Sequence, residues 1–217
     1  MARHDELIAQ VDAVREELAA ANRAREVGLA ACRQVIRASG SSIRLVHRLD
    51  PAGAAALADE AEAALRDAQA AVEPFPAIAH AGFLHDAEKE FVEARATALL
   101  VQGEPIPSYA ELQVLPTSWL RGLAEAASEL RRHLLDRVRD GDLDRGEELL
   151  AAMDDVYDVL VTVDFPDAVT SGLRRTVDAL RAVLERTRGD VTTTVLQTRL
   201  RDQLAAASTV PPPATGV

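Results

Sequence analysis

Apolar residues recur along most of the chain at intervals of three and four positions, which is the period of an amphipathic helix. The first such stretch covers about residues 3–38, with apolar side chains at Leu7, Val11, Val14, Leu18 and Ala21. The small polar run SGSS (39–42) is expected to kink or end this helix, after which the pattern resumes as far as Asp50. The pair Asp50–Pro51 is typical of a new helix start.

The remaining sequence predicts further helices with short breaks between them. They cover residues 51–72, 76–102, 117–139, 144–162, 166–187 and 191–206. The segment YAELQVL (109–115) is either a short helix or irregular, and no stretch alternates apolar and polar residues for long enough to predict a strand. We therefore expect an all-α, elongated bundle of about seven helices in a single domain over residues 1–207. The Pro-rich end, 208–217, is predicted to be disordered.

The composition agrees with a helical, intracellular protein. Hydrophobic residues make up 48% of the 217 positions, but aromatic residues only 3%, and alanine is the dominant small residue. A single cysteine, Cys32, excludes an internal disulfide and a thiolate zinc cluster. No apolar run approaches the length of about 18 residues needed for a membrane span. We therefore expect a soluble, cytoplasmic protein.

The net charge of −11 argues against a surface covered with nucleic-acid contacts. Positive charge is nevertheless concentrated near the end of the first helix, at Arg23, Arg25, Arg33, Arg37, Arg44 and Arg48. The last four share one face if the helix continues through SGSS. This face is either a binding surface for an anionic partner or a solvated face paired with neighbouring acids.

Two predicted helices each carry a close pair of glutamates. The heptapeptide EKEFVEA (88–94) contains Glu90 and Glu93, which share a narrow arc with Asp86 and Thr97. Glu125 and Glu129 lie one turn apart on the helix over 117–139. Like charges at these spacings repel, and two facing pairs would need a cation between them. A hard divalent cation such as Mg²⁺ prefers carboxylate ligands of this kind; ordinary surface glutamates near arginines are the alternative reading of the same spacing.

The sequence does not match other known motifs for metal or phosphate binding. The segment DGDLDRGEELLA (140–151) resembles a calcium loop in its first acids, but it has Arg145 where that loop needs glycine and Ala151 where it needs glutamate. No histidine follows a glutamate at the spacing of di-iron bundles, and no glycine-rich phosphate loop is present.

The order of several motifs resembles the translin and translin-associated factor X family over about residues 22–192. The matching elements are VHRL (46–49), the Glu90/Glu93 helix, a stretch from Gly122 to Arg132, the turn DGDLD (140–144), and Val156–Tyr157–Asp158. The resemblance implies an all-α bundle. In the factor X branch it implies a magnesium site, with Mn²⁺ as the alternative ion, for endonucleolytic cleavage of single-stranded RNA.

Carried over by position, the catalytic and metal-binding residues are Glu90, Glu93, Glu125 and Glu129. Metal bound there would activate water for phosphodiester hydrolysis. The family usually has aspartate at the position of Glu125, and the basic stretch that translin carries before the acidic helix is thin here. We therefore place the RNA contacts, or contacts to single-stranded DNA, at Arg33, Arg37, Arg44, His47 and Arg48.

The resemblance also implies a closed, hollow homo-oligomer of about eight subunits, that is, an octamer. Two other functions remain open at this point. One is a non-catalytic single-stranded nucleic-acid-binding protein like translin, and the other is an all-α nucleoside triphosphate pyrophosphohydrolase, which builds a magnesium site from similar glutamate motifs. A purely structural helical adaptor fits if the glutamates are solvated and bind no metal.

Overall fold

The computed structural model describes residues 2–208, which form an all-α structure without a strand. Six long helices and two single-turn helices follow one another along the chain. They are α1 (Ala2–His47), α2 (Pro51–Val72), α3 (Pro76–Ala79), α4 (Phe83–Gln102), α5 (Pro116–Arg139), α6 (Leu143–Leu160), α7 (Asp167–Thr170) and α8 (Leu173–Ser208). The predicted all-α bundle is confirmed, and the predicted tail after Ser208 lies outside the described residues.

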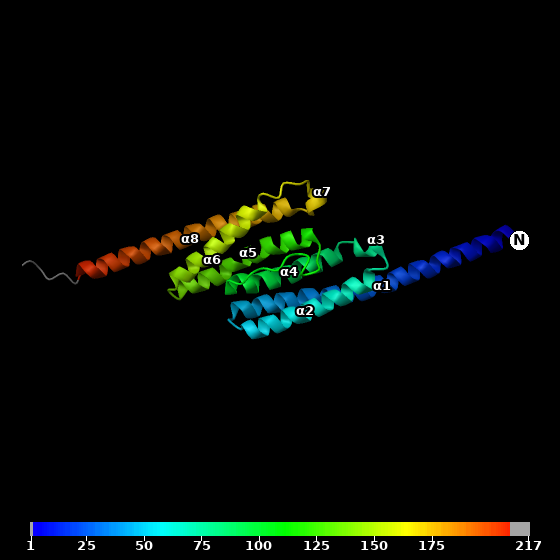
Figure 1. Ribbon diagram of the computed structural model, residues 1–217, viewed down its shortest axis with the longest axis horizontal. Coiled ribbons are helices and arrows are strands. Elements are labelled where there is room, and N and C mark those ends of the chain that lie inside the picture. Colours follow the sequence, from blue (N-terminus) through cyan, green and yellow to red (C-terminus); the bar gives the residue numbers. More distant parts are fainter. Residues whose placement is uncertain (1, 209–217) are drawn as a thin grey trace, which may run out of the picture.

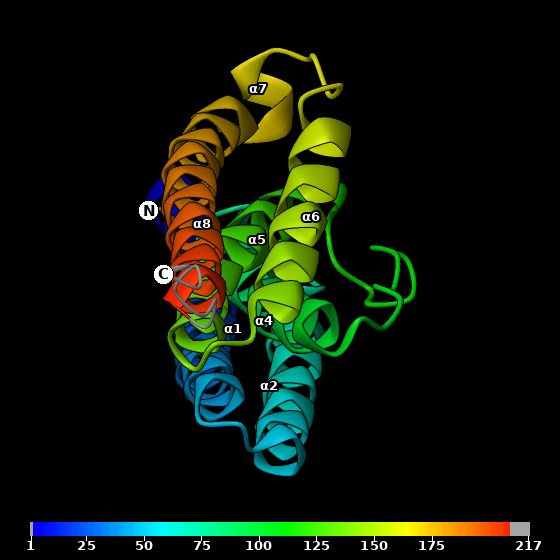
Figure 2. The same cartoon turned by 90° about the vertical axis from the view of Figure 1, so that its left-hand side faces the viewer.

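The long helices are arranged in three layers of two (Figure 2). Helices α1 and α2 form one outer layer, α4 and α5 the middle layer, and α6 and α8 the other outer layer. Because α4 packs against α1, α2 and α5, it buries side chains on several sides. A polar group on α4 that faces a neighbouring helix therefore needs a partner there.

Small side chains let the helices approach closely. Helix α2 buries a stripe of alanines at Ala54, Ala58, Ala61, Ala64 and Ala68. Leu65 and Phe91 fill the space between the first two layers. The core can be filled by alanine, leucine and valine with few aromatic residues, because closely spaced helices leave little volume between them.

Two predicted helix breaks are wrong. Helix α1 runs through SGSS, where Ser42 Oγ donates a 2.7 Å hydrogen bond to the Ala54 carbonyl of α2. Helix α8 runs through Gly189, where we expected one helix to end and another to begin. A single helical glycine costs only about 1 kcal/mol relative to alanine, and the burial of Leu184 and Val191 on either side of it outweighs that cost.

The opposite error occurs near residue 80. The predicted helix over 76–102 is divided into α3 and α4, with a turn at 80–82. Gly82 has a φ of +94°, a conformation that glycine adopts without the steric penalty of other residues. The predicted bounds of α2 are correct, and those of α5 and α6 agree with the structure to within two residues.

Two helices extend beyond the bundle and give the molecule its elongated shape (Figure 1). The N-terminal part of α1 projects at one end, and the C-terminal part of α8 projects at the other. Both carry exposed apolar side chains: Leu7, Ile8, Val11, Val14 and Leu18 on α1, and Leu196, Leu200 and Leu204 on α8. Between residues 2 and 208, none of the helices combines the length and the hydropathy required to cross a lipid bilayer.

Candidate functional site

The middle layer is closely packed at Gly122 of α5. A Cβ atom on Gly122 would lie 2.7 Å from the Lys89 carbonyl oxygen and 2.7 Å from the Cβ atom of Val92, both on α4. Any residue other than glycine would therefore push the two helices apart. Glu125 lies one turn after Gly122, so this contact brings its carboxylate close to the acidic residues of α4.

Three of the four predicted metal ligands converge across the α4–α5 interface. Carboxylate oxygens of Glu90, Glu93 and Glu125 all lie within 4.8 Å of one another. Glu90 and Glu125 are half-buried, whereas Glu93 is only 9% exposed. We call these three residues the acidic cluster.

Burial and mutual repulsion disfavour full ionisation of the three carboxylates in the acidic cluster. Burial, with the neighbouring carboxylates of Glu125 and Glu90 acting in the same direction, raises the pKa of Glu93 to about 8. Near neutral pH, Glu93 therefore holds a proton in the metal-free protein. A bound cation would favour the ionised carboxylate and would thereby lower the pKa of Glu93.

The side chain of Lys89 supplies a positive charge inside the acidic cluster. Its Nζ atom lies 3.0 Å from Glu90 Oε1 and 2.5 Å from Glu125 Oε2, and the side chain is largely buried. Burial opposes the charged form, but the hydrogen bonds to Glu125 and Glu90 outweigh it and raise the pKa of Lys89. The glutamate spacing did not predict this role of Lys89, although the sequence carries a signal for it: the only lysine of the chain stands directly before Glu90.

Glu129 lies outside the acidic cluster and has a different partner. Its Oε2 atom is 3.0 Å from His47 Nε2, at the end of α1. This hydrogen bond lowers the pKa of Glu129, against the opposing effect of burial. The His47 side chain is only 3% exposed, so the structure gives it a role different from the RNA contact that we predicted: it holds Glu129.

No family profile matches the sequence. The chain is 29% identical over 202 residues to an uncharacterized protein of Methanocaldococcus jannaschii, MJ0175. The aligned region covers 91% of this chain and 83% of that protein. The crystal structure of AfC3PO is similar with a TM-score of 0.79 and 30% identity, over 87% of this chain and 98% of that one. The chain belongs to the C3PO/translin family.

Two further solved structures are similar to the chain. The structure of an AfC3PO–duplex RNA complex matches with a TM-score of 0.71 and 31% identity, over 87% of this chain and 97% of that one. The crystal structure of apo-NeC3PO matches with a TM-score of 0.76 and covers 85% of this chain and 96% of that one, but at 18% identity it supports the fold alone.

Other acidic residues near the translin-family motif have separate structural roles. Glu88 is buried and accepts hydrogen bonds from Gln69 Nε2 at 3.1 Å and from the Leu115 amide at 3.2 Å. It thereby fixes the irregular segment before α5. Asp86, which shares the predicted arc, is exposed and lies 4.0 Å from Arg121, while Thr97 on the same arc is fully buried.

The predicted RNA-binding arginines are exposed, three of them on the C-terminal half of α1 and Arg48 directly after its end. Arg33, Arg37, Arg44 and Arg48 all reach the solvent. Arg44 Nη2 donates a 2.7 Å hydrogen bond to Ser41 Oγ. The other three side chains have no ion pair or hydrogen bond within residues 2–208. Their guanidinium groups are therefore available to an anionic partner.

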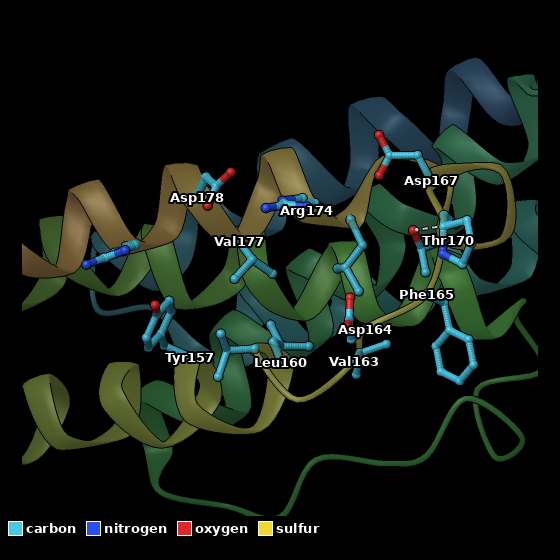
Figure 3. Close-up of a pocket in the computed structure, with 14 residues that line it drawn as sticks. Tyr157, Leu160, Val163, Asp164, Phe165, Asp167, Thr170, Arg174, Val177 and Asp178 are labelled. Atoms are coloured by element: carbon cyan, nitrogen blue, oxygen red, sulfur yellow. Dashed lines mark hydrogen bonds between the residues drawn. The ribbon is translucent and has the colours of Figure 1, made fainter.

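One cavity lies apart from the acidic cluster. It is a groove of about 810 Å³ between the end of α6, the segment leading to α7, and the start of α8 (Figure 3). Figure 3 shows Tyr157, Arg174 and Asp178 among its lining residues, with the Phe165 ring projecting from the connecting segment. A smaller cavity of about 410 Å³ includes Glu125 in its lining and adjoins the acidic cluster.

Proposed function

We propose that this member of the translin family is a Mg²⁺-dependent endoribonuclease that cleaves single-stranded RNA. In this proposal Glu90, Glu93 and Glu125 bind the metal, and Glu129, held by His47, completes the site. The observation that carries the proposal is the convergence of three carboxylates to within 4.8 Å of one another in a chain of this family.

The donor set of the acidic cluster fits a hard divalent ion. Mg²⁺ binds carboxylate oxygens at about 2.0–2.1 Å and keeps several waters, so small side-chain rotations would bring these oxygens to the required distance. When bound, the metal would lower the pKa of a water molecule and neutralise charge that develops on the phosphate. Mn²⁺ has similar ligand preferences.

The residues of the chain have separable tasks in this proposal. Lys89 must leave the cluster for a metal to enter, and its flexible stem then lets the ammonium group reach a phosphate oxygen. The hydrogen bond from His47 keeps Glu129 in one orientation and in its charged form. The exposed arginines of α1 bind the backbone of the RNA through its phosphates.

The choice of RNA as the substrate rests on the family and on the positive face of α1. One of the similar structures is a complex of AfC3PO with duplex RNA, so a duplex is the second substrate to test. With few aromatic residues for base stacking, binding through phosphates should depend strongly on salt.

One observation favours a second function, a nucleic-acid-binding protein without catalysis. Lys89 already neutralises part of the cluster through Glu90 and Glu125. If the lysine keeps this position in solution, the cluster is a buried ion-pair network and not a metal site. RNA would then bind to the arginine face without being cleaved.

We also propose that the chain assembles as a closed homo-oligomer, an octamer. The apolar stripes on the projecting ends of α1 and α8 support this, because such surfaces usually mark protein–protein contacts.

The deciding experiment is cleavage of a labelled single-stranded RNA with Mg²⁺ and with EDTA. We expect cleavage only with Mg²⁺, and a loss of about 100-fold or more in the Glu93→Gln and Glu125→Gln variants, which each remove one ligand charge. The matched control is Glu104→Gln, because Glu104 is exposed and its side chain has no partner within residues 2–208.

The outcomes separate the two functions. Metal-dependent cleavage that survives Glu104→Gln but not the cluster variants supports the nuclease. Salt-dependent RNA binding with no cleavage under any condition would assign the chain to the non-catalytic class. A duplex RNA tested in parallel shows which form is preferred.

A further inference from the structure

A cavity with two arginines lies directly beside the acidic cluster. It has a volume of about 410 Å³ and lies between α5 and the start of α8. The residues that matter for its chemistry are Arg121, Glu125 and Ser128 from α5, and Arg175 and Thr176 from α8. Because Glu125 belongs to both the cavity and the acidic cluster, a group bound in the cavity is a neighbour of a group bound at the cluster.

Neither arginine of the cavity is held by a close carboxylate. The nearest acidic contact of Arg121 is Asp86 at 4.0 Å, and the buried Nε atom of Arg121 has no hydrogen-bond partner. The Arg175 side chain is exposed and has no ion pair or hydrogen bond within the described part of the chain. By contrast, Arg131 on α5 pairs with Asp190 of α8 at 2.8 Å. The cavity therefore holds two guanidinium groups that lack a close carboxylate partner, in a chain with a net charge of −11.

The cavity has the chemistry of a phosphate site. Guanidinium groups bind phosphate oxygens through paired N–H donors. The Thr176 hydroxyl has no partner within residues 2–208 and can donate one more hydrogen bond, whereas Ser128 Oγ already donates to the Ala124 carbonyl at 3.1 Å. Glu125 would repel an anion, but its charge is partly compensated, by Lys89 in this structure and by the metal in the proposed function.

We propose that Arg121 and Arg175 bind a backbone phosphate of the RNA, next to the phosphate that lies at the acidic cluster. This inference rests on the proposed function, because it assumes that an RNA strand passes over Glu125. The cavity then fixes the register of the strand: with one phosphate held between α5 and α8, a neighbouring phosphodiester is placed at the cluster. Arg175 is thus a substrate-positioning residue.

The sequence offers a matched pair of variants for the test. Arg174 and Arg175 are adjacent, exposed and equal in charge, but they face different cavities. Arg174 lines the groove of Figure 3, whereas Arg175 lines the cavity beside Glu125. Arg174→Ala and Arg175→Ala therefore change net charge and helix composition equally. Unchanged thermal unfolding in both variants would confirm that they are folded.

The measurement is fluorescence anisotropy of a labelled single-stranded RNA across a series of salt concentrations. Ca²⁺ replaces Mg²⁺, and a gel checks that the RNA stays intact. We expect Arg175→Ala to weaken binding by about tenfold, and to reduce the slope of log affinity against log salt by about 0.7, the value for one phosphate contact on a single strand. Arg174→Ala should behave like the wild type.

Each result decides the proposal. Equal binding by the two variants, whether both retain affinity or both lose it, would overturn the phosphate site. A wild-type protein that binds no RNA would overturn this inference and the proposed function together. Binding without cleavage in Mg²⁺ would remove the nuclease, and the comparison of Arg175→Ala with Arg174→Ala would still decide the phosphate site.

Discussion

At the scale of single residues, the heptapeptide EKEFVEA (88–94) places its charged side chains in different surroundings. Glu88 binds an amide hydrogen of the segment before α5, Lys89 bridges two carboxylates, and Glu93 is buried with a raised pKa. The cause is the rotation of about 100° per residue in a helix. On a helix with neighbours on several sides, each step turns the next side chain toward a different partner.

The pKa of Glu93 leads to a prediction about stability and pH. The folded-state pKa is about 8 and the ordinary value is 4.5. Between these values the folded chain keeps a proton that the unfolded chain releases, so the free energy of unfolding falls as pH rises. In EDTA, we expect the Tm of the wild type to drop by about 5 °C or more between about pH 5 and about pH 8. Thermal unfolding followed by circular dichroism measures this.

The Glu93→Gln variant isolates the responsible group. It cannot ionise, so its Tm should fall clearly less over the same range, while the exposed-site control Glu104→Gln should follow the wild type. If Glu93→Gln shows the wild-type slope, the carboxyl of Glu93 is not the protonated group. Added Mg²⁺ should stabilise the wild type more than the variant, because the metal replaces the proton at that carboxyl.

At the scale of elements, the site depends on the contact between α4 and α5. Gly122 allows α5 to lie against the Lys89 carbonyl, and Glu125 follows one turn later. The His47–Glu129 hydrogen bond adds α1 to this arrangement. The candidate site is therefore built by three helices whose functional residues are up to 82 positions apart in the sequence.

A substitution at Gly122 tests this dependence. We expect Gly122→Ala to lower the free energy of unfolding by about 1–3 kcal/mol, because its Cβ would lie 2.7 Å from two atoms of α4. The same change should weaken Mg²⁺ binding, since it moves Glu125 away from Glu90 and Glu93. Urea unfolding and calorimetric titration with Mg²⁺ provide the two readouts.

Gly189→Ala is the matched control, since Gly189 is also helical but a Cβ there would meet no atom within 4 Å. It should stabilise the protein by about 0.5–1 kcal/mol, the usual gain of alanine over glycine in a helix. Equal effects of the two substitutions would show that close packing at Gly122 is unimportant.

In the molecule as a whole, the projecting helix ends expose apolar side chains that the monomer does not bury. Leu7, Val11 and Leu18 are each about half exposed or more, and they share one face of the free part of α1 (Figure 1). A monomer gains nothing from such a face in water, whereas a contact between subunits would bury it. This agrees with the proposed homo-oligomer.

We expect a triple variant, Leu7→Ser, Val11→Ser and Leu18→Ser, to reduce the molar mass measured by size-exclusion chromatography with light scattering. A control with Ala9→Ser, Ala13→Ser and Glu16→Ser changes the opposite face of the same helix and should keep the wild-type mass. The prediction is wrong if both variants elute like the wild type, or if the wild type is itself a monomer.

Local sequence patterns were sufficient to predict the helical architecture. Apolar residues at a spacing of three and four, few aromatic residues and the Asp50–Pro51 start signal are local features, and they were enough to predict an all-α bundle and the bounds of α2. The same local signals failed at SGSS and at Gly189, because burial on both sides of a weak helical position outweighs its low propensity. They failed also at Gly82, where the backbone turns between α3 and α4.

Which charged groups contact one another depends on how the helices pack. The spacing of the glutamates predicted two acidic pairs, but it did not separate Glu129, which binds His47, from the three carboxylates that converge. Nor did it place Lys89 between them or Arg175 beside Glu125. Helical periodicity fixes the direction of a side chain relative to its own helix. The partners of that side chain depend on the distance between the packed helices and on their relative shift along the helix axes.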